Sequence, residues 1–301
     1  MSAVPINRSS EPAAPVAIGD LAAAEEADVA VDVGRSTRRR KTLIWVARIA
    51  TLVIVIGGWQ LLTTAKIIDP FFWGQPSGIV KQLGNWAQHG TQYGSIWEQI
   101  WITFKEALLG FAFGGAIGVT TGVLLGQFRF LADVASPYIK VANAVPRIVL
   151  GALFTVALGL GIASKVALAS VLVFFVVFFN AFQGVREVDR NLLNNARVLG
   201  ASRAAITRHV VLPSALTWII ASLHVAFGMA IIGAIVGELL GAQKGLGLVI
   251  ATSQNNFNPN GVFAAMFIIA VLALAAEGLI GLLERRLLSW RPPAPSEIPT
   301  T

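Results

Sequence analysis

The chain has 301 residues, of which 55% are hydrophobic and only 13% are charged. A soluble domain carries about a quarter charged residues, so this composition excludes a soluble globular protein and indicates an integral membrane protein. The net charge of +7 does not indicate nucleic-acid binding, because the basic residues stand at the ends of apolar runs. The chain has no cysteine and three histidines, so it offers no disulfide, thiol or structural zinc site.

The N-terminal segment lacks the pattern of a folded element. The first 34 residues are rich in alanine, proline and serine, contain six acidic residues and have no apolar signal-peptide core. We predict that residues 1–42 form a disordered tail that ends in a basic anchor, Arg35 to Lys41 (RSTRRRK). By the positive-inside rule, this anchor places the N-terminus in the cytoplasm.

Six stretches are long and apolar enough to cross the roughly 30 Å hydrocarbon layer as helices. They are residues 43–63, 104–126, 137–159, 165–185, 214–238 and 261–283. With this N-terminal orientation, the cytoplasmic segments are the loops after the second and fourth spans and the C-terminal tail. These segments contain arginines, as the positive-inside rule requires, which agrees with the orientation set by the basic anchor. We predict an all-α integral membrane fold with a transmembrane domain over residues 43–290, a cytoplasmic loop over 186–213 and a cytoplasmic C-terminal tail over 291–301.

The second span and the outer loops have features of their own. Glycines recur at spacings of three and four, at Gly110, Gly114, Gly115, Gly118 and Gly122, and predict a face against which another helix packs closely. The segment 64–103 is rich in tryptophan and phenylalanine, which is typical of chain that lies along the membrane interface. The segment 239–260 contains an apolar run too short to span, which indicates a re-entrant or surface-lying element.

The third span contains a proline followed by a cation. Pro146 should kink or unwind the helix, and this places Arg147 beside Asn143 at a broken helix, where a solute could be met. The alternative is a buried ion pair of Arg147, with Glu277 of the last span as its partner. An ionisable residue near the bilayer centre costs on the order of 3 kcal/mol, so Arg147 needs one of these two roles.

Three further polar residues lie within or at the ends of the spans. Asn180 and His224 either line a path or form hydrogen bonds between helices, and Glu238 belongs either to a gate or to a solvated external surface. The candidate pathway or gate residues are therefore Asn143, Pro146, Arg147, Asn180, His224 and Glu238.

The cytoplasmic loop is predicted to form two short helices. Residues 190–199 (RNLLNNARVL) and 201–211 (ASRAAITRHVV) each carry a narrow apolar face, and Gly200 separates them. A helical pair of this size suits docking into the groove of a partner protein, with charge to steer it. The alternative is a loop that lies on anionic lipid.

The string NNARVLGASRAAITRHVVLPSAL, which begins at Asn194, resembles the cytoplasmic loop signature of ATP-binding-cassette (ABC) importer permeases. That signature reads E-A-A, three residues, G, nine residues, I-x-L-P. Gly200 takes the glycine position, Leu212 and Pro213 close the motif, and Val210 stands in place of the isoleucine.

The start of the signature departs from the family. Ala196 matches the last residue of the triplet, but Asn194 and Asn195 replace its first two residues, so the acid and any salt bridge that it makes are lost.

The resemblance extends over about residues 45–290, and the residues around the fourth span and after the fifth are similar to those of permeases for nitrate, sulfonates, taurine and thiamine-precursor pyrimidines.

The resemblance implies a type I (MetI-like) importer bundle in the bacterial inner membrane, with both termini cytoplasmic. It also implies a cytoplasmic ABC ATPase that uses the ATP, an external solute-binding protein and a second copy of the permease in a homodimer, all within membrane lipid. This chain has no phosphate loop of the form G-x-x-x-x-G-K-[ST], so we expect no enzyme activity, cofactor or metal of its own. The implied ATPase-coupling residues are Asn194, Asn195, Ala196, Leu199, Gly200, Arg203, Val210, Leu212 and Pro213.

Two other functions fit a six-span protein. A secondary transporter or channel independent of ATP would show coupling acids deep in the bundle or an inverted repeat, and the acid that we expect there is limited to Glu277. An intramembrane enzyme would need a nucleophile with a base, whereas His89, His209 and His224 fall at different depths and cysteine is absent.

Overall fold

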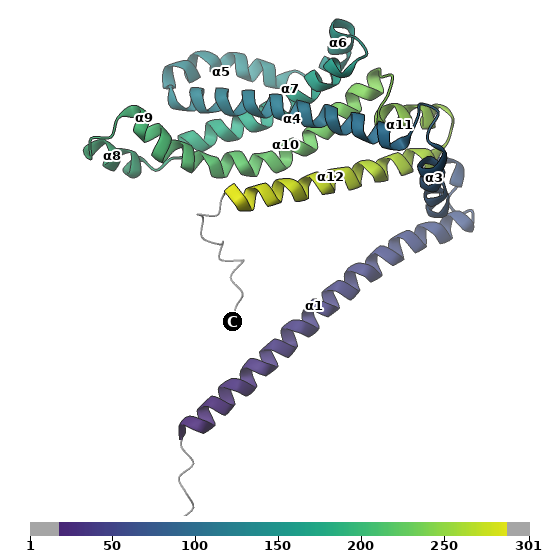
Figure 1. Ribbon diagram of the computed structural model, residues 1–301, viewed down its shortest axis with the longest axis horizontal. Coiled ribbons are helices and arrows are strands. Elements are labelled where there is room, and N and C mark those ends of the chain that lie inside the picture. Colours follow the sequence, from purple (N-terminus) through teal and green to yellow (C-terminus); the bar gives the residue numbers. More distant parts are fainter. Residues whose placement is uncertain (1–17, 288–301) are drawn as a thin grey trace, which may run out of the picture. The chain divides into compact units, whose positions relative to one another are not determined.

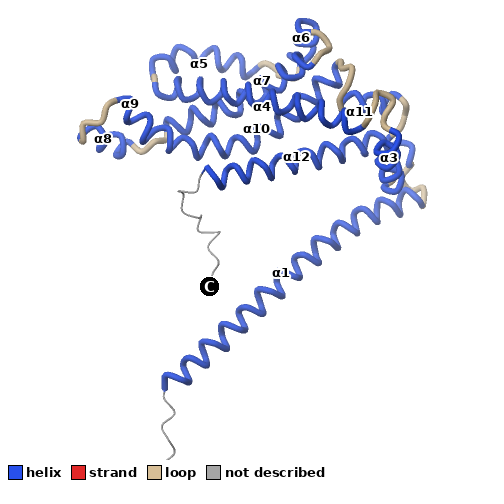
Figure 2. Tube along the Cα trace, viewed as in Figure 1, coloured by secondary structure: helices blue, strands red, loops and turns tan. Residues whose placement is uncertain are grey.

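The computed structural model describes residues 18–287, and the regular elements in this range are helices (Figures 1 and 2). The prediction of an all-α membrane fold is confirmed. Five helices are long and apolar enough to cross a membrane, or up to six if one bent pair counts as a single span. The chain divides into two units, residues 1–62 and 63–301, each of which is described by itself.

The first unit is dominated by α1 (Ile18–Thr64), whose last 23 residues, Thr42–Thr64, form the candidate membrane span. The prediction of a disordered tail is therefore wrong from Ile18 onward, and residues 1–17 lie outside the described range. Alanine is the strongest helix former, and residues 18–34 contain several alanines and no proline.

Three long helices form the centre of the second unit. They are α4 (Ile96–Gln127), α7 (Ile162–Arg186) and α10 (Leu212–Leu240), and α7 packs along both of the others. Their shared core is built from small and β-branched side chains, among them Ala107, Val173 and Ala230, all fully buried. A dry core of small residues lets three helix backbones approach closely within the apolar layer.

The glycine face of α4 was predicted correctly. A methyl group on Gly110 would lie 2.3 Å from Cβ of Ala169, and similar overlaps with α7 arise at Gly114, Gly118 and Gly122. Gly115 differs, because nothing lies within 4 Å of the position where its Cβ would stand. A methyl group on Gly233 of α10 would lie 2.5 Å from Cα of Ala169, so α4, α7 and α10 meet at this one alanine.

The third expected span is not a single helix. It divides into α5 (Arg129–Ala144) and α6 (Val149–Leu158), whose axes are bent by 94° at the break. Pro146 lies in this break and cannot donate a backbone hydrogen bond, so the predicted interruption at this residue is confirmed.

The remaining elements lie at the two ends of the second unit (Figure 1). One end carries α8 (Arg190–Val198) and α9 (Arg203–Ile206), and we call it the α8 end, residues 186–213. The other, the α11 end, comprises residues 70–95 and 241–258, with α2 (Pro70–Trp73), α3 (Pro76–His89) and α11 (Leu246–Asn255). From there α12 (Pro259–Leu287) runs back along α10.

Candidate translocation and coupling sites

At the α8 end, α8 is a short, well-capped helix. The Asp189 carboxylate accepts a hydrogen bond from the backbone N–H of Asn191, 2.8 Å away, which satisfies one free donor at the helix start. After α8, Gly200 adopts φ +79°, and the N–H groups of Gly200 and Ala201 bond back to carbonyls of the helix. Glycine is favoured here because L residues with a side chain rarely adopt this left-handed conformation.

The two faces of α8 differ in their surroundings. Leu193 and Ala196 are partly buried against a cluster that includes Val185, Val188 and Ile206. On the other side, Val198 and Leu199 are 86% and 85% exposed, and Asn194, Asn195 and Arg197 are exposed as well. Arg203 and Arg208, which follow in the same loop, are also exposed. An exposed apolar pair in a loop with several exposed arginines is suited to a protein partner with an acidic rim.

The second helix of the loop is continuous with a membrane helix. After Ser202 caps α9, a π-helical turn (Thr207–Val211) leads directly into α10, and Arg203–Leu240 qualifies as one 38-residue span. Pro213 follows the π-helical turn within this continuous helix, and Val210 and Leu212 are half-buried. The Thr207 hydroxyl donates to the Gln127 side chain at the end of α4.

Asn143 and Arg147 come together at the break between α5 and α6. The Arg147 guanidinium donates a hydrogen bond to Oδ1 of Asn143, and its central carbon lies 4.5 Å from the centre of the Phe175 ring on α7. Its Nε–H is buried and has no hydrogen-bond partner. The expected alternative, an ion pair with Glu277, is not formed, since Glu277 is exposed on α12.

A cavity of about 310 Å³ opens between α5 and α7 beside this pair. Asn143 lines it together with Lys140 and Asp133 of α5 and Arg186 of α7, and three phenylalanines of α7 form its apolar wall. Two cations, one acid and an amide around an aromatic wall suit a small solute that carries a negative group.

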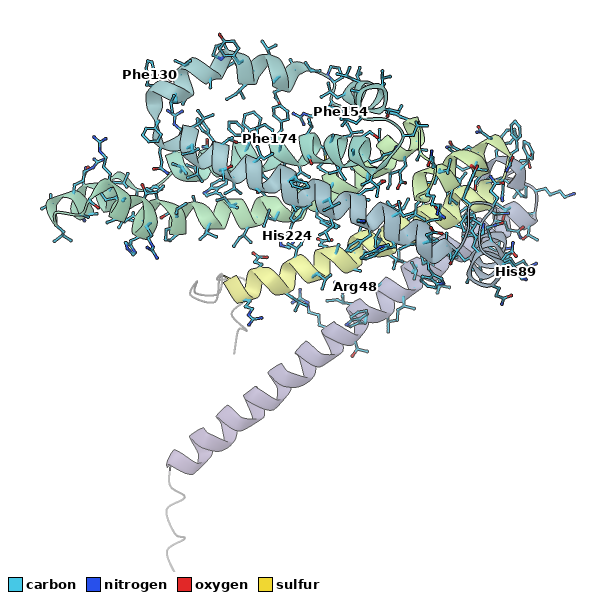
Figure 3. All side chains as sticks on the ribbon, turned by 45° about the horizontal axis from the view of Figure 1, so that its top comes forward. Arg48, His89, Phe130, Phe154, Phe174 and His224 are labelled. Atoms are coloured by element: carbon cyan, nitrogen blue, oxygen red, sulfur yellow. The ribbon has the colours of Figure 1, made fainter. Side chains whose placement is uncertain are left out.

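The other candidate pathway residues lie elsewhere. Nδ2 of Asn180 donates to the carbonyl of Val176 in its own helix, so Asn180 does not form the bond between helices that we considered. His224, labelled in Figure 3, faces α12 and contacts Oε2 of Glu284 at 2.9 Å. Glu238 is 1% exposed, so it is not a solvated surface residue.

Glu238 belongs to a polar cluster that sequence reasoning missed. Its carboxylate accepts hydrogen bonds from the Thr103 hydroxyl at 2.7 Å and the N–H of Gly247 at 2.5 Å. Glu106 and Lys165, 2% and 1% exposed, lie close by. The acids buried within the bundle are thus Glu106 and Glu238, and not Glu277 as expected. The helical spacing of Gln99, Thr103 and Glu106, which places all three on one face of α4, could have indicated this cluster from the sequence.

Comparisons with known proteins agree with this architecture. Residues 114–289 match the family described as binding-protein-dependent transport system inner membrane component. The chain is 30% identical over 252 residues to SsuC of Bacillus subtilis (strain 168), a permease protein named for aliphatic sulfonates transport, which covers 84% of this chain and 90% of that protein. It is 27% identical over 243 residues to the taurine transport system permease protein TauC of Escherichia coli (strain K12), covering 80% and 88% of the two chains.

A solved structure shares the fold. The chain superposes on one from an inward-facing conformation of the MetNI methionine ABC transporter with a TM-score of 0.56 and 20% sequence identity, over 64% of this chain and 96% of that chain. At this level of identity the similarity concerns the fold alone. It covers nearly all of the other chain, in agreement with the expected bundle.

Proposed function

Because the chain belongs to the family of binding-protein-dependent transport system inner membrane components, we propose that it forms the membrane path for a small organic solute with a sulfonate group, such as an aliphatic sulfonate or taurine. Membership makes it a multi-pass inner-membrane permease subunit of an ABC importer. The family implies that a separate ATPase supplies the energy and that a solute-binding protein delivers the solute.

The half-buried Arg147, whose Nε–H is buried without an acceptor, carries the proposal for a solute with a negative group. Its positive charge is held by an amide and an aromatic face rather than by a carboxylate, and its Nε–H has no acceptor. A buried donor without an acceptor costs about 1–3 kcal/mol, which a passing sulfonate oxygen would offset. Arginine also presents several donors in a plane, which matches the geometry of an oxyanion.

The neighbouring cavity supports the same solute class. Its polar lining contains Lys140 and Arg186 against a single acid, Asp133, so the balance of charge attracts an anion. The phenylalanine wall offers apolar surface to the short carbon chain of an aliphatic sulfonate or taurine. The names of SsuC and TauC, which refer to aliphatic sulfonates and taurine, agree with this choice.

We assign the ATPase dock to the exposed side of the α8 end. Val198 and Leu199 provide the apolar anchor, with Asn194, Asn195 and Arg203 around it and Gly200 setting the angle between the two helices. Nucleotide-driven movement of the ATPase would then pull directly on helix Arg203–Leu240. We further propose that two copies of the chain form the permease, because a symmetric pair would enclose a path between them.

The test is uptake by the reconstituted importer, which contains the permease, its ATPase and its binding protein in proteoliposomes. The solutes compared are a labelled aliphatic sulfonate, taurine, nitrate and an uncharged pyrimidine of the thiamine-precursor kind. We expect ATP-driven uptake of the aliphatic sulfonate or of taurine, and no uptake of the pyrimidine. Uptake of the pyrimidine alone would contradict the proposal.

Variants at Arg147 locate the effect in the membrane path. Arg147→Gln should lower uptake by about tenfold or more, since a hydrogen bond to a charged group contributes about 1.5–3 kcal/mol, whereas Arg147→Lys should retain part of it. Arg48→Gln, which changes an exposed arginine of α1, is the matched control and should have no effect. Equal uptake by the Arg147→Gln variant and the unmodified protein would rule out this role.

A further inference from the structure

The first turn of α11 is held by side chains of two other helices. Oε1 of Gln99 accepts from the N–H of Gly245 at 2.7 Å, and Oγ1 of Thr103 accepts from the N–H of Leu246 at 2.9 Å. Oε2 of Glu238 accepts from the N–H of Gly247 at 2.5 Å. Three successive backbone donors at the helix start, which have no partner within the helix, are thus all satisfied by α4 and α10.

Thr103 joins the two helices as well as holding α11. Its hydroxyl donates to Oε1 of Glu238 at 2.7 Å while it accepts from Leu246, so one oxygen links α4, α10 and α11. Gln99 and Thr103 are 0% exposed and Glu238 is 1% exposed. Hydrogen bonds to a carboxylate that water does not reach are strong and directional, because water does not compete for the acceptor.

The backbone around the Glu238 carboxylate has no spare room. A Cβ on Gly245, which adopts φ +120°, would lie 2.1 Å from Oε1 of Glu238, and a Cβ on Gly247 would lie 2.6 Å from its Cβ. The carboxylate therefore fills the space that side chains at these two positions would need. This close fit means that α11 cannot shift relative to the end of α10 without breaking these bonds.

Glu238 also stands at the far end of a single long helix. Helix Arg203–Leu240 begins three residues after Gly200 at the α8 end and runs for 38 residues, or roughly 55 Å at 1.5 Å per residue. Glu238 is in its last turn, so a displacement of the loop can reach Glu238 along one continuous helix. Beyond Glu238, α11 forms one wall of a cavity of about 120 Å³ with Val249, Thr252 and Ser253.

We propose that Glu238, with Thr103 and Gln99, positions α11 and transmits the movement of helix Arg203–Leu240 to the α11 end. This inference rests on the proposed docking of the ATPase at the α8 end. Glu238 acts here as a positioning residue, since it touches α11 rather than the solute. Movement of the loop would thereby reshape the cavity at the opposite end of the bundle.

The experiment uses the full importer in nanodiscs, without solute, so an error in the proposed solute class does not affect it. The permease contains no cysteine, which allows spin labels at single introduced cysteines. One pair, at the exposed Gln254 of α11 and the exposed Lys105 of α4, reports on α11; a second, at the exposed Val225 and Leu108, reports on α10. Distances are measured with and without ATP.

In the unmodified protein both pairs should change distance on ATP binding. Thr103→Val, which keeps the shape but removes the hydroxyl, should abolish the α11 change while the α10 change persists, and Thr103→Ser should restore it. Ser222→Ala, which removes a buried hydroxyl that bonds within α10, is the control.

Gln99→Met provides a second variant if Thr103→Val does not assemble, and it should likewise uncouple the two distances. An α11 change in Thr103→Val and Gln99→Met equal to that of the unmodified protein would overturn the inference. An α11 distance that never responds to ATP in the unmodified protein, while the α10 distance does, would overturn it too. Absence of both changes would instead contradict the ATPase dock at the α8 end, and the inference would fall with it.

Discussion

Gly114 and Ser170 bring α4 and α7 so close that a methyl group on Gly114 would lie 2.3 Å from the carbonyl oxygen of Ser170. A carbonyl in a helix is bonded along that helix and cannot swing away. The separation of these two membrane helices is therefore set by the absence of a side chain at Gly114. Its neighbour Gly115 faces open space, although both belong to the same run of glycines.

Alanine at these adjacent positions should have opposite effects. Gly114→Ala forces α4 away from α7 and should destabilise the bundle by about 1–3 kcal/mol, the usual range for overpacking. Gly115→Ala meets no neighbour and should be neutral or slightly stabilising, because alanine favours the helix by up to about 1 kcal/mol over glycine. The measurement is the fraction of monodisperse protein after heating in mild detergent. Equal loss in both variants would contradict the packing account.

Valine and asparagine in place of Gly200 should affect ATP hydrolysis differently. Nothing lies within 4 Å of its Cβ position, so the difficulty of substitution comes from φ +79° and not from a clash. Gly200→Val should cost about 1–2 kcal/mol at this angle and distort the turn between α8 and α9, whereas Gly200→Asn tolerates the angle. We expect Val, but not Asn, to reduce ATP hydrolysis stimulated by the loaded binding protein. Unchanged hydrolysis in Gly200→Val would remove this role of the glycine.

The exposed apolar pair on the loop should anchor the ATPase. Val198→Asp combined with Leu199→Asp should leave the permease folded, since both side chains are more than four-fifths exposed, yet should prevent copurification of the ATPase. Asn191→Ala changes an exposed residue of the same helix and serves as the control. Retention of the ATPase by the double variant would show that the dock lies elsewhere.

Pro137 within α5 and Pro146 in the break before α6 allow a test of what causes the bend between these helices. Pro146→Ala removes the residue that interrupts the helix and makes helix formation at this position about 3 kcal/mol more favourable. The 94° bend should then open, so that spin labels at the exposed Tyr138 and Val156 move apart. Pro137→Ala alters a proline within α5, where the helix already continues. Only the first variant should change the distance and lower uptake; identical distances in both would assign the bend to packing instead.

Features that depend on local sequence were predictable. The positions of the membrane helices, the break at Pro146 and the glycine face of α4 follow from composition and spacing along one stretch of chain. Gly200 between two short helices belongs to the same group. The helix over residues 18–42 was not predicted, because alanine-rich sequence is compatible with both a disordered tail and a helix.

The polar cluster around Glu238 depends on residues far apart in the chain. Thr103 and Glu238 are 135 positions apart, and neither carries a sign of the other in its neighbourhood. Lys105 and Glu106 are adjacent and both charged, yet Lys105 is exposed and Glu106 is 2% exposed, because successive helical residues point in different directions. Only the packing of α4 against α7 and α10 decides which of the two is buried.

The most direct test of the proposed function is uptake of a labelled sulfonate into proteoliposomes that contain the permease with its ATPase and binding protein. Import should require ATP, should persist when proton and sodium gradients are dissipated, and should stop when the ATPase is omitted. Import by the permease alone, driven by an ion gradient and indifferent to ATP, would contradict the assignment and establish a secondary transporter.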